Sequence, residues 1–406
     1  MQTPPHGAQA ATASRWRILA LVWLAYLCFG LTASTIAPLV EPILQDLDMT
    51  SGQMGLVLGV WQLMFIVSAS PLGTLVDRIG ERRAIAIGLS VVLASLVLRG
   101  LAVDFVTLLL AVALFGLGGP VISIGAPKVV SLWFRGNQRG IAAGIYGTGP
   151  VTGMAIALST AASVVVPLTG SWRGVSLVYG VVVAAVLLLW LLLARNAPPE
   201  ARQDGNADAQ DSNERGLSVL GDLLRVGNVR LILALGAVAF MLNHGLQNWL
   251  PTLLTEKGMT LEQAGTWVGV ATAFGVAGQL LLPSLARQGY RVMTLGAMLA
   301  LSAVTTAGLA ALTGAPVIAV LLVSSVVRVP LMPVLTLLLM ETKGVGARRI
   351  GSAAGLFFAA SEVGGFSGPF VMGLLRDATG DLSAGVYALA CIAGVMLVLL
   401  PFVRER

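Results

Sequence analysis

Charged residues are scarce in this chain. Lys, Arg, Asp and Glu together make up 11% of its 406 residues, whereas soluble domains contain about 25%. Hydrophobic residues make up 56% of the chain, and its mean hydropathy is +0.88. This composition excludes a soluble enzyme of this length and indicates a membrane protein with many spans.

Cysteine and histidine are almost absent, with two residues of each. Cys28 and Cys391 lie inside apolar runs, where we expect small core residues and no disulfide or metal ligand. The sequence has no G-x-x-x-x-G-K-[ST] motif, and the body of the chain holds a single histidine, His244. These absences argue against an ATP-driven pump, a metal site, a cofactor and a Ser/His/Asp enzyme.

Long apolar runs make up most of the chain. Twelve of them are near or above the roughly 20 residues needed to cross a bilayer, and a lone span satisfies its backbone hydrogen bonds only as a helix. The sequence therefore predicts an all-α membrane protein with twelve transmembrane helices. The runs cover residues 18–40, 53–76, 84–103, 105–132, 141–168, 174–194, 231–254, 263–285, 292–312, 315–340, 351–374 and 384–403.

The basic residues indicate how the spans are oriented, because positive loops stay on the cytoplasmic side. With both termini cytoplasmic, 19 of the 25 Lys and Arg residues fall in cytoplasmic segments. Four lie at the outer side, namely Arg99, Arg173, Lys257 and Arg376. The expected location is the inner (cytoplasmic) membrane. Since the bases cluster in loops, the net charge of +6 does not point to nucleic acid.

One long polar break divides the spans into two sets of six. Pro198, Pro199 and scattered polar residues predict a flexible linker, and the leucines of 217–226 predict a short helix on the membrane surface. The expected organisation is a cytoplasmic N-terminal tail (1–17), a first six-helix half (18–194), a cytoplasmic linker (195–230) and a second six-helix half (231–403).

A charged segment, residues 73–83, lies between the second and third spans. We expect a short loop at the cytoplasmic face, with room for close backbone approach at Gly73 and a turn at Gly80. The segment resembles the signature G-x-L-a-D-r-x-G-r-r/k of the major facilitator superfamily. The matching residues are Gly73, Leu75, Asp77, Arg78, Gly80 and Arg82, while Glu81 stands where the family usually has a base.

The resemblance implies the two-half fold of this superfamily and secondary active transport by alternating access. In the family, the acid of this loop helps to hold the cytoplasmic side closed, a role that the resemblance assigns to Asp77, with Arg82 beside it. A second family signature, G-P-x-x-G, is linked with exchangers and drug exporters, and Gly149, Pro150 and Gly153 match it. The alternative is a bend and a helix-packing site, because proline bends helices and glycine allows close packing.

Two ionisable residues lie deep within spans, where a charge costs about 2.5–3.5 kcal/mol on insertion scales. Arg328 is 13 residues from both Ala315 and Glu341, so at about 1.5 Å per residue it lies roughly 20 Å from either end of its span. Glu362 lies at similar depth in the next span. We expect Arg328 to bind an anion or form an ion pair, and Glu362 to pair with it, carry a proton or bind a cation.

A row of polar residues marks the seventh span. Asn243 and Gln247 are four residues apart, as are His244 and Asn248, so the four share one side of a helix. We expect this side to face a central cavity, although a lone buried histidine is more often only hydrogen-bonded. Gln62, in the second span, is a weaker candidate of the same kind.

Lys128 and Arg328 are two intramembrane cations set against one carboxylate, Glu362. This balance favours a small organic or inorganic anion as substrate, and in this respect the chain is similar to cyanate and organic-anion members of the superfamily. Lys128 lies about two turns inside the cytoplasmic end of its span, so its amine can instead extend to water. The second hypothesis is export of hydrophobic drugs. A third, of another class, is a non-transporting receptor or lipid-handling protein with the same fold.

The expected partners are a small-molecule substrate, membrane lipids and H⁺ or another coupling ion, and the protein is expected to act as a monomer. Many proton-coupled members of the superfamily carry an arginine in the fourth span, shortly before a Gly-x-Gly. Val112 occupies the matching place here, before Gly116 and Gly118. The resemblance therefore leaves the coupling ion open.

Overall fold

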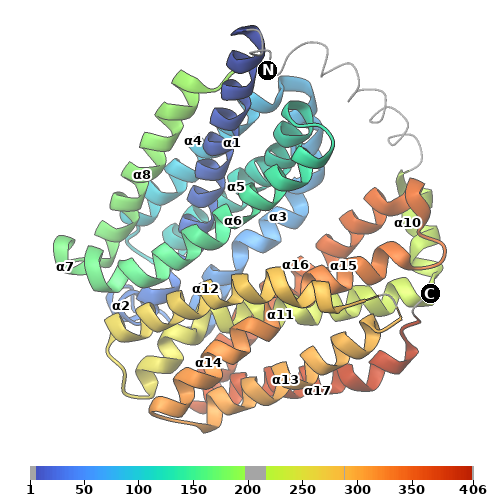
Figure 1. Cartoon of the computed structure of the whole chain (residues 1–406). Coiled ribbons are helices and arrows are strands. Elements are labelled where there is room, and N and C mark those ends of the chain that lie inside the picture. Colours follow the sequence, from blue (N-terminus) through green and yellow to red (C-terminus); the bar gives the residue numbers. More distant parts are fainter. Residues whose placement is uncertain (1–5, 197–215, 288, 405–406) are drawn as a thin grey trace.

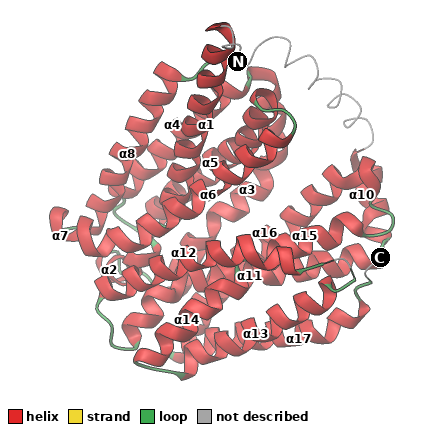
Figure 2. Ribbon diagram, viewed as in Figure 1, coloured by secondary structure: helices red, strands yellow, loops and turns green. Residues whose placement is uncertain are grey.

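The computed structural model describes residues 6–196, 216–287 and 289–404, apart from the side chains of 6–14, 70, 77, 137, 216–218 and 346–348. All regular secondary structure in these residues is helical (Figure 2). Twelve helical segments there are long and apolar enough to cross a membrane. The prediction of an all-α fold with twelve transmembrane helices is confirmed.

The first half begins with a helix that is interrupted earlier than predicted. The elements of this half are α1 (His6–Ala33), a 3₁₀ turn (Ala37–Leu39), α2 (Val40–Asp46), α3 (Ser51–Ile79), α4 (Glu81–Gly100), α5 (Phe105–Trp133), α6 (Asn137–Thr160), a π-helical turn (Ala161–Val165), α7 (Val166–Thr169) and α8 (Trp172–Leu193). The runs predicted at 18–40 and 141–168 are thus not single α-helices. Each changes form just before a proline, Pro38 or Pro167, which has no N–H group for the helical ladder.

The second half contains one further break. Its elements are α10 (Gly216–Arg225), α11 (Gly227–Glu256), α12 (Leu261–Leu285), α13 (Arg291–Ala311), α14 (Ala315–Arg328), α15 (Leu331–Glu341), α16 (Gly346–Thr379), α17 (Ser383–Leu399) and a 3₁₀ turn (Leu400–Phe402). The run predicted at 315–340 therefore consists of two helices, α14 and α15. The run predicted at 384–403 ends in a 3₁₀ turn after α17. The short helix predicted at 217–226 corresponds to α10, while residues 197–215 of the predicted linker lie outside the described residues.

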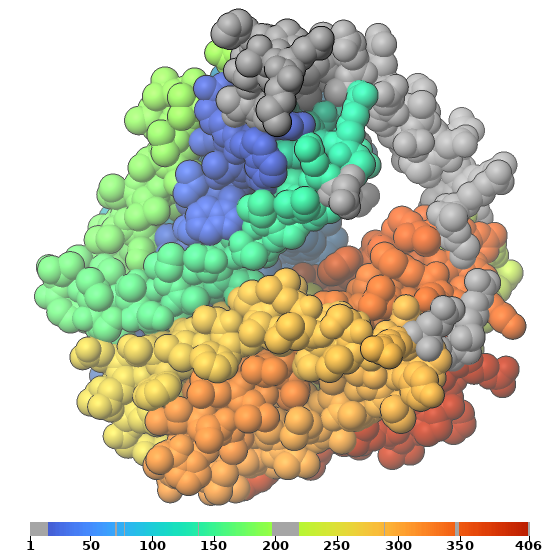
Figure 3. Space-filling view, viewed as in Figure 1, coloured from blue at the N-terminus to red at the C-terminus, as the bar shows by residue number. Residues whose placement is uncertain are grey.

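The two halves form two bundles that diverge from one end of the molecule to the other (Figure 1). We refer to the end where α8 stops and α10 begins as the linker end. The opposite end, with the turns at 47–50, 170–171 and 257–260, is the far end. The main contacts between the halves join α3 to α16 and α6 to α12. Figure 3 shows the halves in contact at the far end and a cleft between them toward the linker end.

Glycines bring the two backbones together at the far end. A Cβ on Gly373 of α16 would lie 2.2 Å from the carbonyl oxygen of Ser51, at the start of α3. A Cβ on Gly55 of α3 would lie 2.5 Å from the carbonyl oxygen of Pro369. Any larger residue would press against backbone at these positions, so glycine permits this close packing.

Polar contacts also join the halves at the far end. The carboxylate of Asp377 accepts hydrogen bonds from the backbone N–H groups of Ser51 (2.8 Å) and Gly52 (2.7 Å). These groups begin α3, and a negative charge at a helix N-terminus is stabilising. The neighbouring Arg376 pairs with Glu41 of the first half, at 3.1 Å between Nη2 and Oε2. The far end is therefore closed by backbone packing and by charge.

Candidate functional site

The tenth span breaks directly after Arg328. α14 ends at this residue and α15 begins at Leu331. Pro330 lacks the N–H group that would bond to the carbonyl of Val326, so the α-helical ladder is interrupted. Non-helical backbone within a membrane is tolerated where it is buried in protein or lines a cavity. Arg328 thus occupies the end of a half-helix in the middle of a span.

The side chain of Arg328 is 1% exposed and extends toward α11. Its Nη1 donates to the backbone carbonyls of Asn243 (2.8 Å) and Leu242 (3.3 Å) and to Oδ1 of Asn243 (3.2 Å). Asn243 in turn donates from Nδ2 to the carbonyl of Arg328 at 3.3 Å. These partners are neutral. In the described structure Arg328 and Glu362 do not form the ion pair that was one of the expected alternatives.

A second group of polar side chains surrounds Gly365 of α16. A Cβ on this glycine would lie 3.2 Å from Oε2 of Glu362, 3.3 Å from Cδ2 of His244 and 3.4 Å from Cγ of Gln62. Nε2 of Gln62 lies 3.1 Å from Nδ1 of His244. With the amide nitrogen facing the ring, Nδ1 accepts and the imidazole carries its proton on Nε2. This hydrogen bond joins α3 of the first half to α11 of the second.

Three buried atoms in this region have no hydrogen-bond partner among the described residues. They are Nε of Arg328, Oε1 of Gln62 and Oε2 of Glu362. Buried polar groups in proteins are nearly always hydrogen-bonded, because burying them unpaired costs free energy. The unpaired atoms come from α14, α3 and α16 and lie close to the polar residues of α11. These unpaired groups make this region the candidate binding site for a polar ligand.

Aromatic rings connect this region to the cleft. The ring centroids of Trp61 and Phe240 lie 5.8 and 5.1 Å from that of His244. Phe240 also lines a cavity of about 630 Å³ between α6 of the first half and α12, α15 and α16 of the second. Thr148 and Gln279 add polar groups to its wall. His244 therefore lies one helical turn from a cavity on the linker side of the molecule.

The family model of the Major Facilitator Superfamily matches residues 22–369. The chain belongs to this superfamily. It is accordingly a multi-pass membrane protein of a transporter family, and not an enzyme.

Two proteins of Bacillus subtilis (strain 168) are similar over most of their length. The hexuronate transporter is 26% identical over 399 residues, covering 91% of this chain and 90% of that protein. The nitrite extrusion protein is 23% identical over 389 residues, with the same two coverages.

Solved structures show the same fold. The crystal structure of a bacterial homologue of the human lysosomal transporter Spinster, in an inward-facing and occupied conformation, matches with a TM-score of 0.77. It is 15% identical, and the match covers 99% of this chain and 97% of that one. At this identity the likeness supports the fold alone.

In this superfamily member, the signature segment is not the loop that its sequence predicts. α3 continues to Ile79 and α4 begins at Glu81, so only Gly80 separates them. Gly80 has φ +82°, a backbone conformation that favours glycine. A Cβ on Gly73 would have no neighbour within 4 Å. The close backbone approach expected at Gly73 therefore does not occur in this conformation.

Among the charged residues of the segment, Arg82 contacts its own half. Nη2 of Arg82 donates to the carbonyl of Leu191 (3.0 Å), and the carbonyl of Arg82 accepts from Nε1 of Trp190 (2.9 Å). Arg82 thus joins α4 to α8. Arg78 is exposed. The side chain of Asp77 lies outside the described residues, so its expected gating role stays a prediction.

The G-P-x-x-G motif lies in the contact between α1 and α6. A Cβ on Gly149 would lie 2.8 Å from the carbonyl oxygen of Trp23, and one on Gly153 would lie 2.0 Å from that of Leu27. Pro150 stands inside α6, which is continuous there. This geometry is that of a helix-packing site, the alternative interpretation of the motif.

The remaining candidate residues, Gln247 and Lys128, contact other parts of the structure. Nε2 of Gln247 donates to Oγ1 of Thr272 on α12 at 3.1 Å, so the predicted row on α11 faces three different neighbours. Lys128 lies on α5 of the first half with a partly exposed side chain. In the part of the chain that the structure describes, no three His, Cys, Asp or Glu side chains are grouped as metal ligands.

Sequence reasoning missed one buried cation. Arg99, which it places at the outer border of its span, is 1% exposed. Its Nη1 donates to the carbonyl of Thr32 at 2.9 Å, and its Cζ lies 5.4 Å from the ring centroid of Phe115. α1 ends at Ala33, so the Thr32 carbonyl lacks a full helical partner. The sequence shows only that Arg99 lies in the last turn of an apolar run. An arginine at that position can equally well extend into water, so its burial could not be predicted.

Proposed function

We propose that this protein is a secondary active transporter that moves a small anionic solute across the cytoplasmic membrane by alternating access. In this proposal the linker end and both termini face the cytoplasm, as the distribution of basic residues favours. The closed far end and the cleft toward the linker end then correspond to an inward-facing state. The solute binds beside α11, at the unpaired polar groups of α3, α14 and α16.

The buried charge of Arg328 carries this proposal. The residue lies at a helix break in the middle of a span, its partners are neutral, and its Nε is buried without a hydrogen bond. A buried cation without a counter-charge is costly. An anionic solute that enters from the cleft supplies that charge, and Asn243 holds the guanidinium in place to receive it.

The similar proteins support an anion as the solute class. Two relatives that are similar over most of their length are named for hexuronate and nitrite, which are both anions. Drug export and a non-transporting receptor are not favoured by these relatives. Gly149 and Gly153 pack closely against α1, and this packing explains their presence without drug export. The motif therefore gives less support to the drug-export hypothesis.

Glu362 is the proposed site of coupling to H⁺. Its Oε2 is buried and unpaired, and it lies beside Gln62 and His244, where the two halves meet. A carboxyl group there can bind and release a proton as the halves rearrange. Glu362→Gln should abolish uptake driven by a pH gradient while solute exchange persists. Gradient-driven uptake by this variant would exclude Glu362 as the carrier.

The test of the solute class is flux into proteoliposomes with hexuronate, nitrate and nitrite as probes. Arg328→Gln should abolish anion uptake, and Arg328→Lys should retain a fraction of it, because the charge remains while the fork of donors is lost. Arg99→Gln is the matched control, since Arg99 is equally buried and is bound to α1. It should lower the melting temperature without changing KM. Full uptake by Arg328→Gln would reject the anion site.

Reporter fusions test the orientation independently. A reporter placed after Arg215 should be cytoplasmic, and one placed after Lys257 should be outside. Both reporters on one side, or the reverse pattern, would contradict the assignment of the linker end to the cytoplasm.

A further inference from the structure

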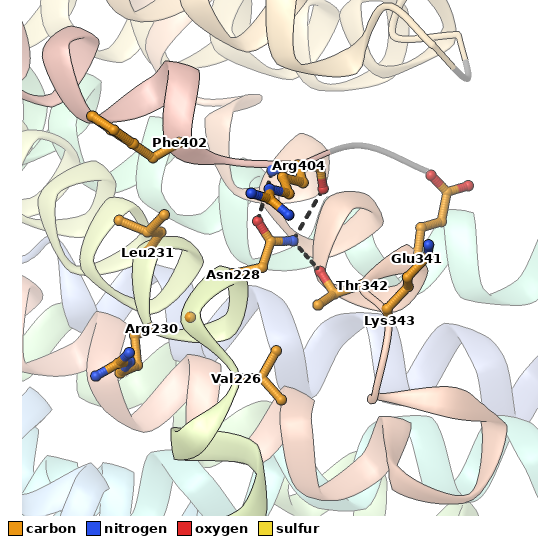
Figure 4. A pocket seen from close by; sticks show the side chains of 10 residues that line it. Val226, Asn228, Arg230, Leu231, Glu341, Thr342, Lys343, Phe402 and Arg404 are labelled. Atoms are coloured by element: carbon orange, nitrogen blue, oxygen red, sulfur yellow. Dashed lines mark hydrogen bonds between the residues drawn. The ribbon is translucent and has the colours of Figure 1, made fainter.

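A second pocket lies at the linker end of the second half, away from the cleft. It has a volume of about 810 Å³ and is formed by the start of α11, the segment that follows α15 and the end of the chain (Figure 4). None of its lining residues belongs to the cavity beside Phe240. The proposed transport cycle gives this pocket no role.

Hydrogen bonds hold its walls together around Asn228. Its Nδ2 donates to Oγ1 of Thr342 at 2.8 Å and to the carbonyl of Arg404 at 3.2 Å. Its Oδ1 accepts from the backbone N–H of Arg404 at 2.9 Å. In Figure 4 these bonds place Arg404 directly against Asn228. The backbone of Arg404 is thereby fixed to the first turn of α11.

The pocket is strongly cationic. Arg230, Lys343 and Arg404 line it and are exposed. Glu341 is the acid among the lining residues, and it pairs with Arg291 outside the pocket. α11 begins here without a side-chain cap, so its N-terminal N–H groups add partial positive charge. The balance favours an anionic ligand.

Apolar side chains stand beside these cations. Phe402 is 65% exposed, and Leu231 is partly buried at the same pocket. Both belong to the ends of spans, at the boundary between bilayer and water. A soluble anion would make no contact with the apolar side of such a site, whereas a phospholipid offers a phosphate to the cations and acyl chains to Phe402 and Leu231.

We propose that this pocket binds the phosphate of an anionic phospholipid headgroup from the leaflet at the linker end. Basic pockets between helix ends recognise such headgroups through charge, and Arg and Lys both bind phosphate. Lys343 and Arg404 contact the phosphate, and Phe402 packs against an acyl chain. The inference is independent of which solute the protein transports.

The experiment is a melting-temperature titration of the detergent-purified protein. The probes are dioctanoyl phosphatidylglycerol, dioctanoyl phosphatidylcholine and inorganic phosphate. A ligand that binds the folded state raises the melting temperature with its concentration. Phosphatidylglycerol should give the larger rise, and inorganic phosphate should give none.

Two double variants locate the effect. Lys343→Gln with Arg404→Gln should weaken the apparent affinity for phosphatidylglycerol roughly tenfold or more. Arg17→Gln with Arg195→Gln removes two exposed bases from the linker end of the first half and should leave the titration unchanged. Equal effects of the two lipids, or an unaltered titration of the pocket variant, would overturn the proposal. An equal rise with inorganic phosphate would assign the pocket to a soluble anion instead.

Discussion

The two ends of α16 differ in what surrounds their glycines. At the far end, Gly373 faces the backbone of α3, and a Cβ there would meet the carbonyl oxygen of Ser51 at 2.2 Å. Toward the linker end, a Cβ on Gly351 or Gly355 would meet nothing within 4 Å. The same contrast separates Gly55 from Gly73 on α3. Helices α3 and α16 are thus in close contact at the far end and lack such contact toward the linker end.

This difference indicates how the two states of an alternating-access cycle are encoded. Close packing needs small residues wherever two backbones meet. At Gly73 and Gly355 an added Cβ would have no neighbour within 4 Å in this conformation. These glycines are suited to a helix contact that forms when the linker end closes. The charged contacts of Asp377 and Arg376 belong to the far end, so we expect them to break in that state.

A substitution that separates α3 from α16 at the far end should have the largest effect on transport. Gly373→Val forces a side chain against the backbone of α3, and overpacking costs about 1–3 kcal/mol, which corresponds to roughly fivefold or more in an equilibrium. The far end should open and transport should fall by a similar factor. The measurement is labelling of Ser159→Cys, in the α6–α12 contact, by an impermeant maleimide in a background lacking Cys28 and Cys391.

Gly355→Val is the matched control, because it adds the same side chain to the same helix in open space. It should not increase labelling at the far end. Equal labelling of the two variants would show that the close contact at Gly373 does not hold this end shut.

Removing the charge at the start of α3 should have a smaller effect. Asp377→Ala deletes two hydrogen bonds to backbone N–H groups, and loss of such a cap costs about 0.5–2 kcal/mol. Labelling at the far end should rise, though less than with Gly373→Val. Asp104→Ala is the control, since Asp104 caps α5 within one half through the N–H of Thr107 at 2.8 Å. It should lower the melting temperature and leave labelling unchanged, and a rise in labelling would refute the assignment.

The smallest structural effect is expected at the open end. Asp77→Asn should keep the fold, shift the population toward the state that is open at the linker end, and lower turnover. A charge near a helix end contributes about 0.3–1 kcal/mol, so a shift of up to about fivefold is expected. Labelling of Thr148→Cys, in the cleft cavity, measures it. Unchanged transport together with unchanged labelling from both sides would exclude a gating role for Asp77.

Much of the fold could be predicted because the bilayer imposes strict rules on sequence. A span needs a long apolar run and a helical backbone, so twelve runs and one polar break predicted twelve helices in two halves. The burial of Arg328 and Glu362 followed from their distance to the ends of their runs, and both are buried, at 1% and 7% exposure. The burial of Arg99 could not be predicted in this way, because a residue in the last turn of a span can face either water or protein.

The sequence by itself determined the number of spans, their grouping and the depth of their charges, since these depend on one-dimensional patterns of hydrophobicity. Only the tertiary structure decided which polar groups meet. It directed Arg328 to the carbonyls of α11 rather than to Glu362, and it placed Gln62 against His244. These choices depend on how each helix is rotated and where it breaks. Rotation is set by packing between distant segments, and no local pattern in the sequence records it.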